Sequence, residues 1–435
     1  MDLVANLEKV LYQYQTAPPV QDLRIQGWRF AVSETSQVKA GIRNNRLGDV
    51  YAAPSLTGNY AGDLLIVWPG DYCSQVVVNN KIISNLEQML PIWKQGAFYD
   101  PEGSALLDPA PLPLVAVEHL PVRQAVTEDP KPCFEILARY RDELPTWQVN
   151  TIQAGVQAGW GLRHIRTSRG LSVTYAQTNF STFVSADGLF GKGFAKRRLP
   201  TEAEMGRLIK ETGETTCLLK REGSLQPGRQ PVIFAPQLAA EFIAKFLLPN
   251  FSGNSVINKQ SAYTLTDFAT QRQVFDPRIS LEINPLRLFE LSSYLCTREG
   301  LPARAEALVS KGKMLTPYLT LKDSIKAGLK PTPLPQAGGL FLNVQGDFNR
   351  LITTTESGIL VYSVLGMHTQ ESVTGNYSLA APYCLIIKDG NITGRAKAVI
   401  SGNFLEHLMD PATEYGNVPE ENTPGLKITT MVGAA

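Results

Sequence analysis

The sequence predicts an α+β fold, in which an N-terminal α/β region with a mixed or antiparallel sheet precedes a strand-rich C-terminal module. Three observations support this class. The chain opens with apolar residues at helical spacing. Its middle part is rich in threonine and aromatic residues at strand spacing. From Gly339 onward, apolar strands alternate with glycine-rich turns, which predicts a β-sandwich or barrel-like module with flanking helices.

Residues 1–100 are the first predicted segment, the N-terminal α/β region. Apolar residues at Leu3, Leu7 and Leu11 predict a helix at the start of the chain. Three strands are expected next, followed by a helix that Asn85 caps and that ends near Lys94. The expected strands are Trp28–Val38, Asp63–Trp68 and Gln75–Ile83.

Residues 101–220 are the second predicted segment, and they complete the N-terminal domain. Prolines recur between Pro101 and Pro121, and each fixes φ and lacks an N–H donor, so this stretch is expected to be an extended connection. A helix is expected over Cys133–Leu144. A β-meander over Trp147–Ala186 and a short helix over Thr201–Lys210 follow.

Residues 221–435 are the third predicted segment, the β-rich C-terminal domain. The polar stretch Lys220–Gln230 marks the boundary before it. A strand at Val232–Phe234 leads into an amphipathic helix that starts near Pro236, and Leu301–Lys311 is predicted to be a further helical region.

Composition and charge argue against membrane and nucleic-acid partners. The chain has 435 residues, of which 43% are apolar, enough to bury the cores of two or three domains. A net charge of +1 gives no general attraction to DNA or anionic lipid. The N-terminus does not resemble a signal peptide, and no apolar run is long enough to span a bilayer. Five widely spaced cysteines without a CxxC motif are expected to be reduced, so we expect a cytoplasmic protein.

Motifs for catalysis are sparse. The sequence has no GxSxG elbow and no Walker A loop. The histidines are far apart and none is paired with another at helical spacing, so ordinary surface or core residues are the simpler interpretation. A metal site assembled from distant residues stays open as an alternative. The histidines are His119, His164, His368 and His407.

Two short segments could be mistaken for binding motifs. Gly188–Gly193 is glycine-rich, but its GxxGxG spacing is not that of a dinucleotide-binding turn, and a plain loop is expected. A basic cluster follows, and we interpret it as a solvated loop or a docking patch for an acidic partner, because it is too short for many phosphate contacts. The cluster consists of Lys192, Lys196, Arg197 and Arg198.

Four fragments together resemble the TldD/PmbA family, peptide-processing proteins once called modulators of DNA gyrase. The first runs from Thr374 to Leu408, TGNYSLAAPYCLIIKDGNITGRAKAVISGNFLEHL, and the second, IRTSRGLSVTYAQT, is similar to a family segment in which a turn joins two strands. The third is REGLPARAEALVSKGKMLTPYLTLKDSIKAG, Arg298–Gly328, and the fourth is the tail TPGLKITTMVGAA. Within the family, the chain resembles the PmbA (TldE) branch, which lacks the HExxxH zinc motif.

The resemblance also indicates where the zinc motif would stand. In the TldD branch, the same strand–Ser/Ala–Pro–helix opening leads into HExxxH. An ungapped alignment places Ala244, Lys245 and Pro249 where the first histidine, the glutamate and the second histidine would fall. Such a zinc site needs imidazole ligands and a carboxylate base, and these three residues supply neither. We therefore expect no catalytic residue, no metal and no cofactor in this chain.

The resemblance implies a dimer, in which a zinc-bearing TldD-type subunit or a second copy is the partner and an enclosed cavity holds extended, unfolded peptide. Strand addition suits such capture, because main-chain hydrogen bonds tolerate varied side chains. Glycine turns would let two backbones approach closely, although an ordinary hairpin turn is the simpler interpretation of any one of them. The candidate peptide-binding or structural residues are Arg298, Glu299, Gly300, Gly375, Asn376, Tyr377, Gly402 and Asn403.

Three functions are compatible with the sequence. The first is a silent PmbA/TldE-like subunit that binds peptide and supports proteolysis by a TldD-type metalloprotease. The second is a peptidase with an unrecognised site. The third is an independent homodimeric binding or regulatory protein of the same family, which includes the older gyrase-modulator idea.

Overall fold

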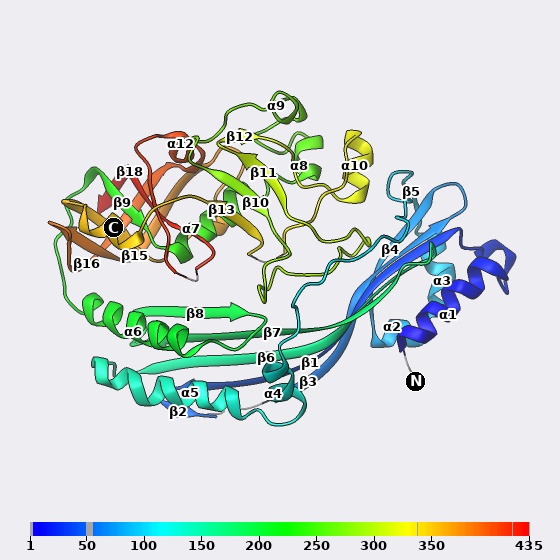
Figure 1. Ribbon diagram of the computed structural model, residues 1–435, viewed down its shortest axis with the longest axis horizontal. Helices are drawn as coiled ribbons and strands as arrows, with labels where there is room; N and C mark the ends of the chain where they lie inside the picture. The colour runs from blue at the N-terminus through cyan, green and yellow to red at the C-terminus, as the bar shows by residue number, and fades with distance from the viewer. Residues whose placement is uncertain (1–2, 49–54, 337, 420, 435) are drawn as a thin grey trace.

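The computed structural model describes residues 3–48, 55–336, 338–419 and 421–434, and it confirms the predicted α+β class. Figure 1 shows two parts that lie against each other. One is a long sheet that carries the N-terminal helices. The other is the strand-rich C-terminal module, which lies over the end of the sheet formed by β7 and β8 and over the loops beside it.

The N-terminal part is built on an eight-stranded antiparallel sheet with the order β5-β4-β3-β1-β6-β7-β8, in which β2 also pairs with β1. Because β8 is the last strand in this order, one of its edges has no neighbour in the sheet. The strands are β1 (Gly27–Arg43), β2 (Arg46–Leu47), β3 (Ser55–Trp68), β4 (Tyr72–Asn79), β5 (Phe98–Tyr99), β6 (Ile152–Thr167), β7 (Ser172–Ala186) and β8 (Phe190–Lys196).

Helices cover one face of this sheet, because apolar residues alternate along its strands. Trp28 and Phe30 of β1 pack in a cluster with α1, α2 and α3, whereas Ala40 and Ile42 at the other end of β1 pack with α4, α5 and α6. The helices are α1 (Leu3–Thr16), α2 (Asn80–Ser84), α3 (Leu86–Gln95), α4 (Leu120–Thr127), α5 (Lys131–Glu143) and α6 (Glu202–Leu219), with 3₁₀ turns η1 (Gln21–Leu23) and η2 (Leu144–Trp147).

Two local predictions in this part are wrong. The strand expected over Gln75–Ile83 ends at Asn79, because the Asn79 side chain accepts a hydrogen bond from the Ile82 N–H and caps α2. Asn85 does not cap α3 with its side chain. Its amide donates instead to the Lys81 carbonyl oxygen at 2.8 Å.

Helix α6 leads from the long sheet to the C-terminal module. It starts at a capping box in which the Thr201 hydroxyl accepts from the Glu204 N–H and the Glu204 carboxylate accepts from the Thr201 N–H. The helix then runs to Leu219, past the end predicted at Lys210, and its last turn is buried against the module.

The C-terminal module contains two sheets. One is antiparallel with the order β12-β11-β10-β13. The other has the order β16-β15-β14-β9-β18-β17, and a further pairing of β16 with β18 closes β16, β15, β14, β9 and β18 into a ring, which is the barrel-like alternative of the prediction. The strands are β9 (Gly228–Phe234), β10 (Ser280–Ile283), β11 (Glu306–Ser310), β12 (Lys313–Met314), β13 (Leu340–Asn343), β14 (Ser357–Val361), β15 (Asn376–Lys388), β16 (Asn391–Asn403), β17 (Glu414–Gly416) and β18 (Gly425–Ala434).

Strand β9 is buried on both sides, which explains its continuous apolar sequence. Val232 and Phe234 face the main core with helix α7, whereas Ile233 packs in a second cluster with Phe190 of β8. The module's helices are α7 (Pro236–Phe242), the π-helical turn η3 (Ile243–Leu247), α8 (Gly253–Ile257), α9 (Leu265–Ala269), α10 (Leu321–Ala327), α11 (Phe348–Thr353), the 3₁₀ turn η4 (Met367–Thr369) and α12 (Phe404–Met409). No helix in the described part of the chain is both long and apolar enough to cross a membrane.

The helical region predicted over Leu301–Lys311 is wrong. Residues Glu306–Ser310 instead form β11, which pairs with β10. Alanine and glutamate favour a helix locally, but Leu308 and Val309 are fully buried in the core of the module. Tertiary pairing therefore outweighs local propensity here.

Phe242 on α7 is a direct test of this core. Its ring is fully buried and contacts Phe234, Phe246, Phe404 and Tyr377. Phe242→Ala is expected to lower the free energy of unfolding by about 3–5 kcal/mol, because it leaves a cavity among aromatic rings.

Urea denaturation followed by tryptophan fluorescence measures this change. Tyr12→Ala on α1 is the control, because the Tyr12 side chain is 61% exposed, and it should change stability by at most about 0.5 kcal/mol. Equal losses in the two variants would contradict the assignment of this core.

Candidate functional site

The segment that follows β9 carries the three residues that the sequence comparison aligned with the zinc motif. Pro236 starts α7, which passes into the π-helical turn, and Pro249 lies in the turn after it. Ala244 is exposed, and the Lys245 ammonium donates to the His368 carbonyl oxygen at 3.3 Å. The buried side chains of this segment are apolar, so its role in packing is clear from Phe246 and its neighbours in the core.

The histidines lie in separate places. His164 on β6 contacts the Thr174 hydroxyl at 3.1 Å, and the His119 ring packs edge-on against Phe289. His407 on α12 contacts a tyrosine of β15. In residues 3–48, 55–336, 338–419 and 421–434, no three His, Cys, Asp or Glu side chains are grouped so that they could hold a metal ion.

Five candidate residues do come together, at the open end of the β15–β16 hairpin. Asn376 pairs with Asn403 in the register of the two strands, and the Asn403 amide donates to the Asn376 side chain at 2.9 Å. The Asn403 side-chain oxygen also accepts from the Glu406 N–H and caps α12. Gly375 has φ +75°, and a Cβ there would lie 2.7 Å from Leu405. These contacts give the Gly-Asn pairs a structural role.

Tyr377 and Gly402 belong to a buried polar cluster beneath this hairpin. The Tyr377 hydroxyl lies 3.0 Å from His407 Nε2 and 3.3 Å from the Thr430 hydroxyl. A Cβ at Gly402 would lie 2.9 Å from the Tyr377 hydroxyl and closer still to Thr430, so only glycine fits. Burial raises the pKa of Tyr377 and, together with the nearby charge of Arg229, lowers the pKa of His407 to about 4. Both side chains are therefore neutral at pH 7.

The other three candidates, Arg298, Glu299 and Gly300, lie in the connection between β10 and β11, where it packs against the long sheet. Glu299 is buried, accepts from the Leu321 N–H at 2.8 Å and lies 3.4 Å from the Arg29 guanidinium of β1. Gly300 has φ +90° and approaches the long sheet so closely that a Cβ would lie 2.5 Å from Leu171, the residue before β7. Arg298 is exposed. The Glu299 and Gly300 contacts join the two parts of the molecule.

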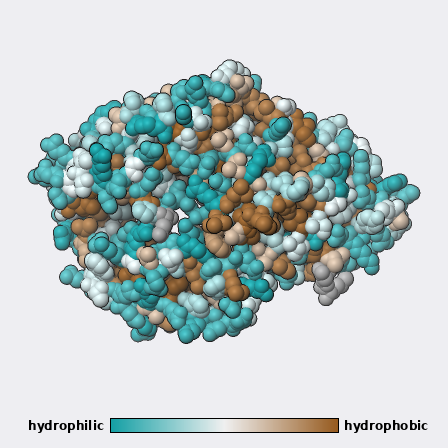
Figure 2. Space-filling model, in the orientation of Figure 1, coloured by the Kyte–Doolittle hydropathy of each residue, from teal (hydrophilic) through white to brown (hydrophobic). Residues whose placement is uncertain are grey.

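A cleft lies between β8 of the long sheet and α7 of the C-terminal module. Its cavity has a volume of about 190 Å³, and residues 192–196 of β8 line it consecutively, opposite Pro236, Gln237 and Ala240. Figure 2 shows the surface hollowed between the two parts, near the place where Figure 1 draws β8 and α7. The open edge of a β-sheet therefore forms one wall of a cleft.

Small residues alternate along this strand. Gly193 and Ala195 are exposed, and Gly191 lies on the same side of β8. A Cβ at Gly191 would lie 2.5 Å from the Phe183 ring of β7, so the neighbouring strand requires glycine there. The segment predicted as a plain loop, Gly188–Gly193, is thus partly strand, because its residues from Phe190 onward pair with β7.

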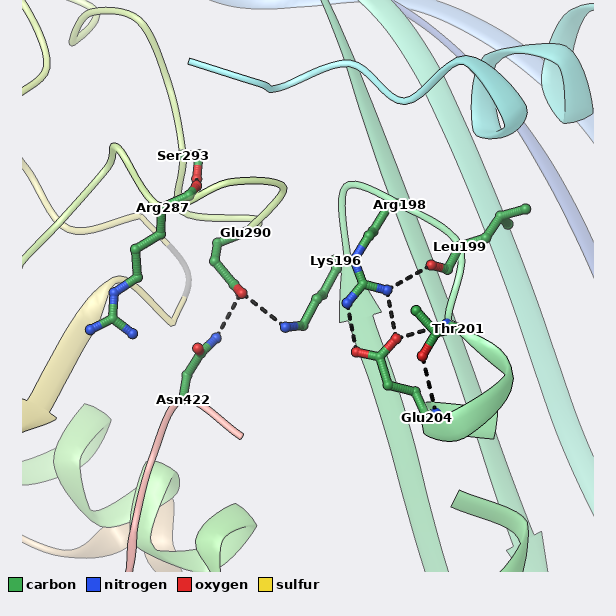
Figure 3. A network of polar contacts seen from close by, with 9 residues as sticks. All are labelled: Lys196, Arg198, Leu199, Thr201, Glu204, Arg287, Glu290, Ser293 and Asn422. Carbon is green, nitrogen blue, oxygen red and sulfur yellow. Dashed lines mark hydrogen bonds and ion pairs between the residues drawn. The ribbon is translucent and has the colours of Figure 1, made fainter. Parts of the chain in front are cut away.

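Ion pairs cross the cleft and fix its walls. The Lys196 ammonium lies 2.9 Å from Glu290, whose other oxygen accepts from the Asn422 amide at 2.6 Å, as Figure 3 shows. Lys192 is paired with Glu211 and lies 3.0 Å from Glu421. Burial alone would lower the pKa of Lys192, but these two carboxylates outweigh it and raise the pKa.

The interpretation of the basic cluster as a solvated loop or docking patch is wrong. Besides the paired lysines, Arg197 is buried and donates to the Ser293 carbonyl oxygen at 2.7 Å. Arg198 holds Glu204 through two hydrogen bonds of 2.5 and 2.7 Å (Figure 3). Apart from Glu204, these acidic and carbonyl partners are distant in sequence. Only the alternation in FGKGFAK indicated that a strand carries the cations.

Residues 227–431 match the family model described as "PmbA/TldA metallopeptidase C-terminal domain". Residues 227–431 thus form a C-terminal domain of the PmbA/TldD type, as the resemblance predicted. An uncharacterized protein of Methanocaldococcus jannaschii is 20% identical over 291 residues, which are 65% of this chain and 68% of that protein.

The fold is also similar to that of solved structures. TldE from Thermococcus kodakarensis superposes with a TM-score of 0.80 at 17% identity, over 100% of both chains. A protein of Thermotoga maritima, described as a candidate modulator of a DNA gyrase, gives a TM-score of 0.80 at 17% identity, over 99% of this chain and 100% of that one. The PmbA/TldD domain thus extends from the start of β9 into β18, and the cleft lies between it and the long sheet.

His407 gives a prediction about the hairpin cluster. Because its folded pKa of about 4 lies below the ordinary value of 6.5, protonation favours the unfolded chain. This effect of His407 protonation is absent above pH 6.5, and it destabilises the fold progressively as the pH falls from 6.5 to 4. We expect His407→Gln to lose less stability than the unmodified protein over this range.

Thermal unfolding of both proteins between pH 7.5 and pH 4 measures the difference. His368→Gln serves as the control, because His368 lies at an exposed turn and should follow the unmodified protein. Parallel curves for His407→Gln and the unmodified protein would contradict a buried, neutral His407.

Proposed function

We propose that this chain is a zinc-less PmbA/TldE-like subunit, which binds extended peptide or unfolded polypeptide and supports its cleavage by a TldD-type metalloprotease partner. The observation that carries the proposal is the unpaired edge of β8, which forms the wall of the cleft. The five cysteines are free thiols, which fits a cytoplasmic location.

Peptide capture by strand addition follows from the chemistry of a sheet edge. Such an edge presents N–H and C=O groups that can pair with any extended chain, independently of its side chains. Gly193 and Ala195 leave space above the edge of β8 for the side chains of a bound peptide. The ion pairs of Lys192 and Lys196 fix the spacing between the two walls.

The chain's own residues argue for a supporting role rather than independent zinc chemistry. Ala244 and Pro249 offer no imidazole, and Lys245 has the charge opposite to that of a general base. A partner with an HExxxH helix would supply the zinc, and with it the activated water that cleaves the peptide. The partner is a TldD-type subunit in this proposal.

DNA binding is a weaker candidate for this chain, although one fold relative is described as a candidate gyrase modulator. The basic cluster is occupied by internal ion pairs and buried carbonyl contacts. Few of its cations are therefore left to neutralise phosphates.

The purified chain is expected to contain almost no zinc and to cleave no peptide alone. Mixed with a TldD-type protein that carries HExxxH, it should give cleavage of an unfolded peptide, which a chelator abolishes. Elemental analysis measures the zinc content, and mass spectrometry of the peptide measures its cleavage.

The matched control is the TldD-type protein alone. One zinc per chain together with chelator-sensitive cleavage by this chain alone would contradict the proposal and favour a peptidase with an unrecognised site. Equal cleavage with and without this chain would favour an independent homodimeric function.

A further inference from the structure

A second cavity, with a volume of about 520 Å³, lies on the face of the long sheet that the helices leave uncovered. Three arginines line it, Arg163, Arg197 and Arg298, and no aspartate or glutamate is among its lining residues. The excess of positive charge is local, because the whole chain has a net charge of only +1.

The sheet supplies one wall of this arginine pocket. Arg163 of β6 is opposite Tyr175 of β7 in the strand register, so both point to the same face. Gln177 and Asn179 follow at alternate positions of β7 and line the pocket with them. The wall therefore offers a guanidinium, a phenol and two amides, all of them groups that can donate hydrogen bonds.

Arg197, the residue after β8, lies at the base of the pocket. It is 8% exposed, and its terminal nitrogens donate to the carbonyl oxygens of Thr178 at 2.9 Å and Ser293 at 2.7 Å. Its Nε is buried and has no hydrogen-bond partner among the described residues. Burial lowers the pKa of this guanidinium, and in the part of the chain that the structure describes no carboxylate compensates its charge. A buried cation without an acidic partner is costly, and an anion in the pocket would relieve that cost.

The carboxylates near the pocket do not neutralise the positive charge of its arginines. Arg298 at its mouth is exposed and lies 4.0 Å from Asp63, at the limit of an ion pair. Glu299 follows Arg298 in sequence, but its carboxylate is directed at Arg29 and at a backbone N–H of α10. Arg163 donates to a neutral partner, the Ser33 hydroxyl, at 2.9 Å.

We propose that the arginine pocket binds a free carboxylate of the peptide. Arginine guanidinium groups match a carboxylate in geometry and charge, and the amides of Gln177 and Asn179 can hold the adjoining peptide bond. The carboxylate has two possible sources, the C-terminus of the peptide or an acidic side chain. This inference rests on the proposed function, since it concerns the peptide that the chain captures.

Fluorescence anisotropy with three labelled peptides of otherwise identical sequence tests the inference on the full chain. One has a free C-terminal carboxylate and no acidic residue, one is its C-terminal amide, and one is the amide with a single internal glutamate. We expect the free acid or the glutamate peptide to bind about tenfold more tightly than the plain amide, the scale of one charge-assisted hydrogen bond. Whichever of the two gains affinity identifies the source.

Arg298→Gln, alone and with Arg163→Gln, should remove this advantage and leave binding of the plain amide unchanged. Arg169→Gln is the matched control, because its side chain is 55% exposed against 53% for Arg298, it also pairs with an aspartate, and it does not line the pocket. Circular dichroism confirms that each variant is folded.

Equal affinity for all three peptides, or an advantage that persists in the double variant, would overturn the arginine pocket while peptide binding stands. Loss of the advantage in Arg169→Gln would also overturn it, because a general charge effect would then explain the result. Failure of every peptide to bind would overturn the proposed function together with this inference.

Discussion

The contact between the long sheet and the C-terminal module is the constraint on which the rest of the molecule depends. Phe190 of β8 packs with Ile233 of β9 in one apolar cluster, and its ring lies 4.9 Å from that of Tyr362. At the other end of this contact, the buried Glu299 carboxylate lies beside Arg29 of β1. Apolar burial supplies the attraction, and the buried ion pair fixes the register, since either charge would be costly alone.

This contact leaves the outer edge of β8 beside the module without covering it. A bare edge strand is normally a risk for aggregation, and proteins protect such edges with charged residues or with cover from another element. Here Lys192 and Lys196 provide the charges, and acids from the module hold both lysines in place. The edge is thus shielded from pairing with other folded sheets.

Local patterns predicted much of this fold. Helix α7 and the π-helical turn η3 followed from the spacing of Leu238, Phe242 and Phe246, and the meander of β6 and β7 followed from alternation. The resemblance rested on four fragments, of which Thr374–Leu408 forms the hairpin and its capped helix. Strand β11 was missed, because its partner β10 lies more than twenty residues away in sequence and overrides a helical composition.

The candidate site was less accessible to sequence reasoning than the fold. The Gly-Asn residues of the hairpin lie close together, as their motif predicted. Their contacts, however, stay within the hairpin and the helix that it caps. Residues that line the cleft and the arginine pocket come from strands and loops far apart in the chain. Glu290 and Glu421, which neutralise the lysines of β8, carry no local signal of that role.

The central claim is that peptide adds to the edge of β8, and amide hydrogen–deuterium exchange tests it most directly. Exchange in residues 190–196 would be compared with and without a saturating unfolded peptide, and β4 near the opposite end of the sheet would be the internal reference. The account predicts that the outward-facing amides of β8 exchange more slowly with peptide, while β4 does not change. Unchanged exchange in β8 despite measured peptide binding would contradict it.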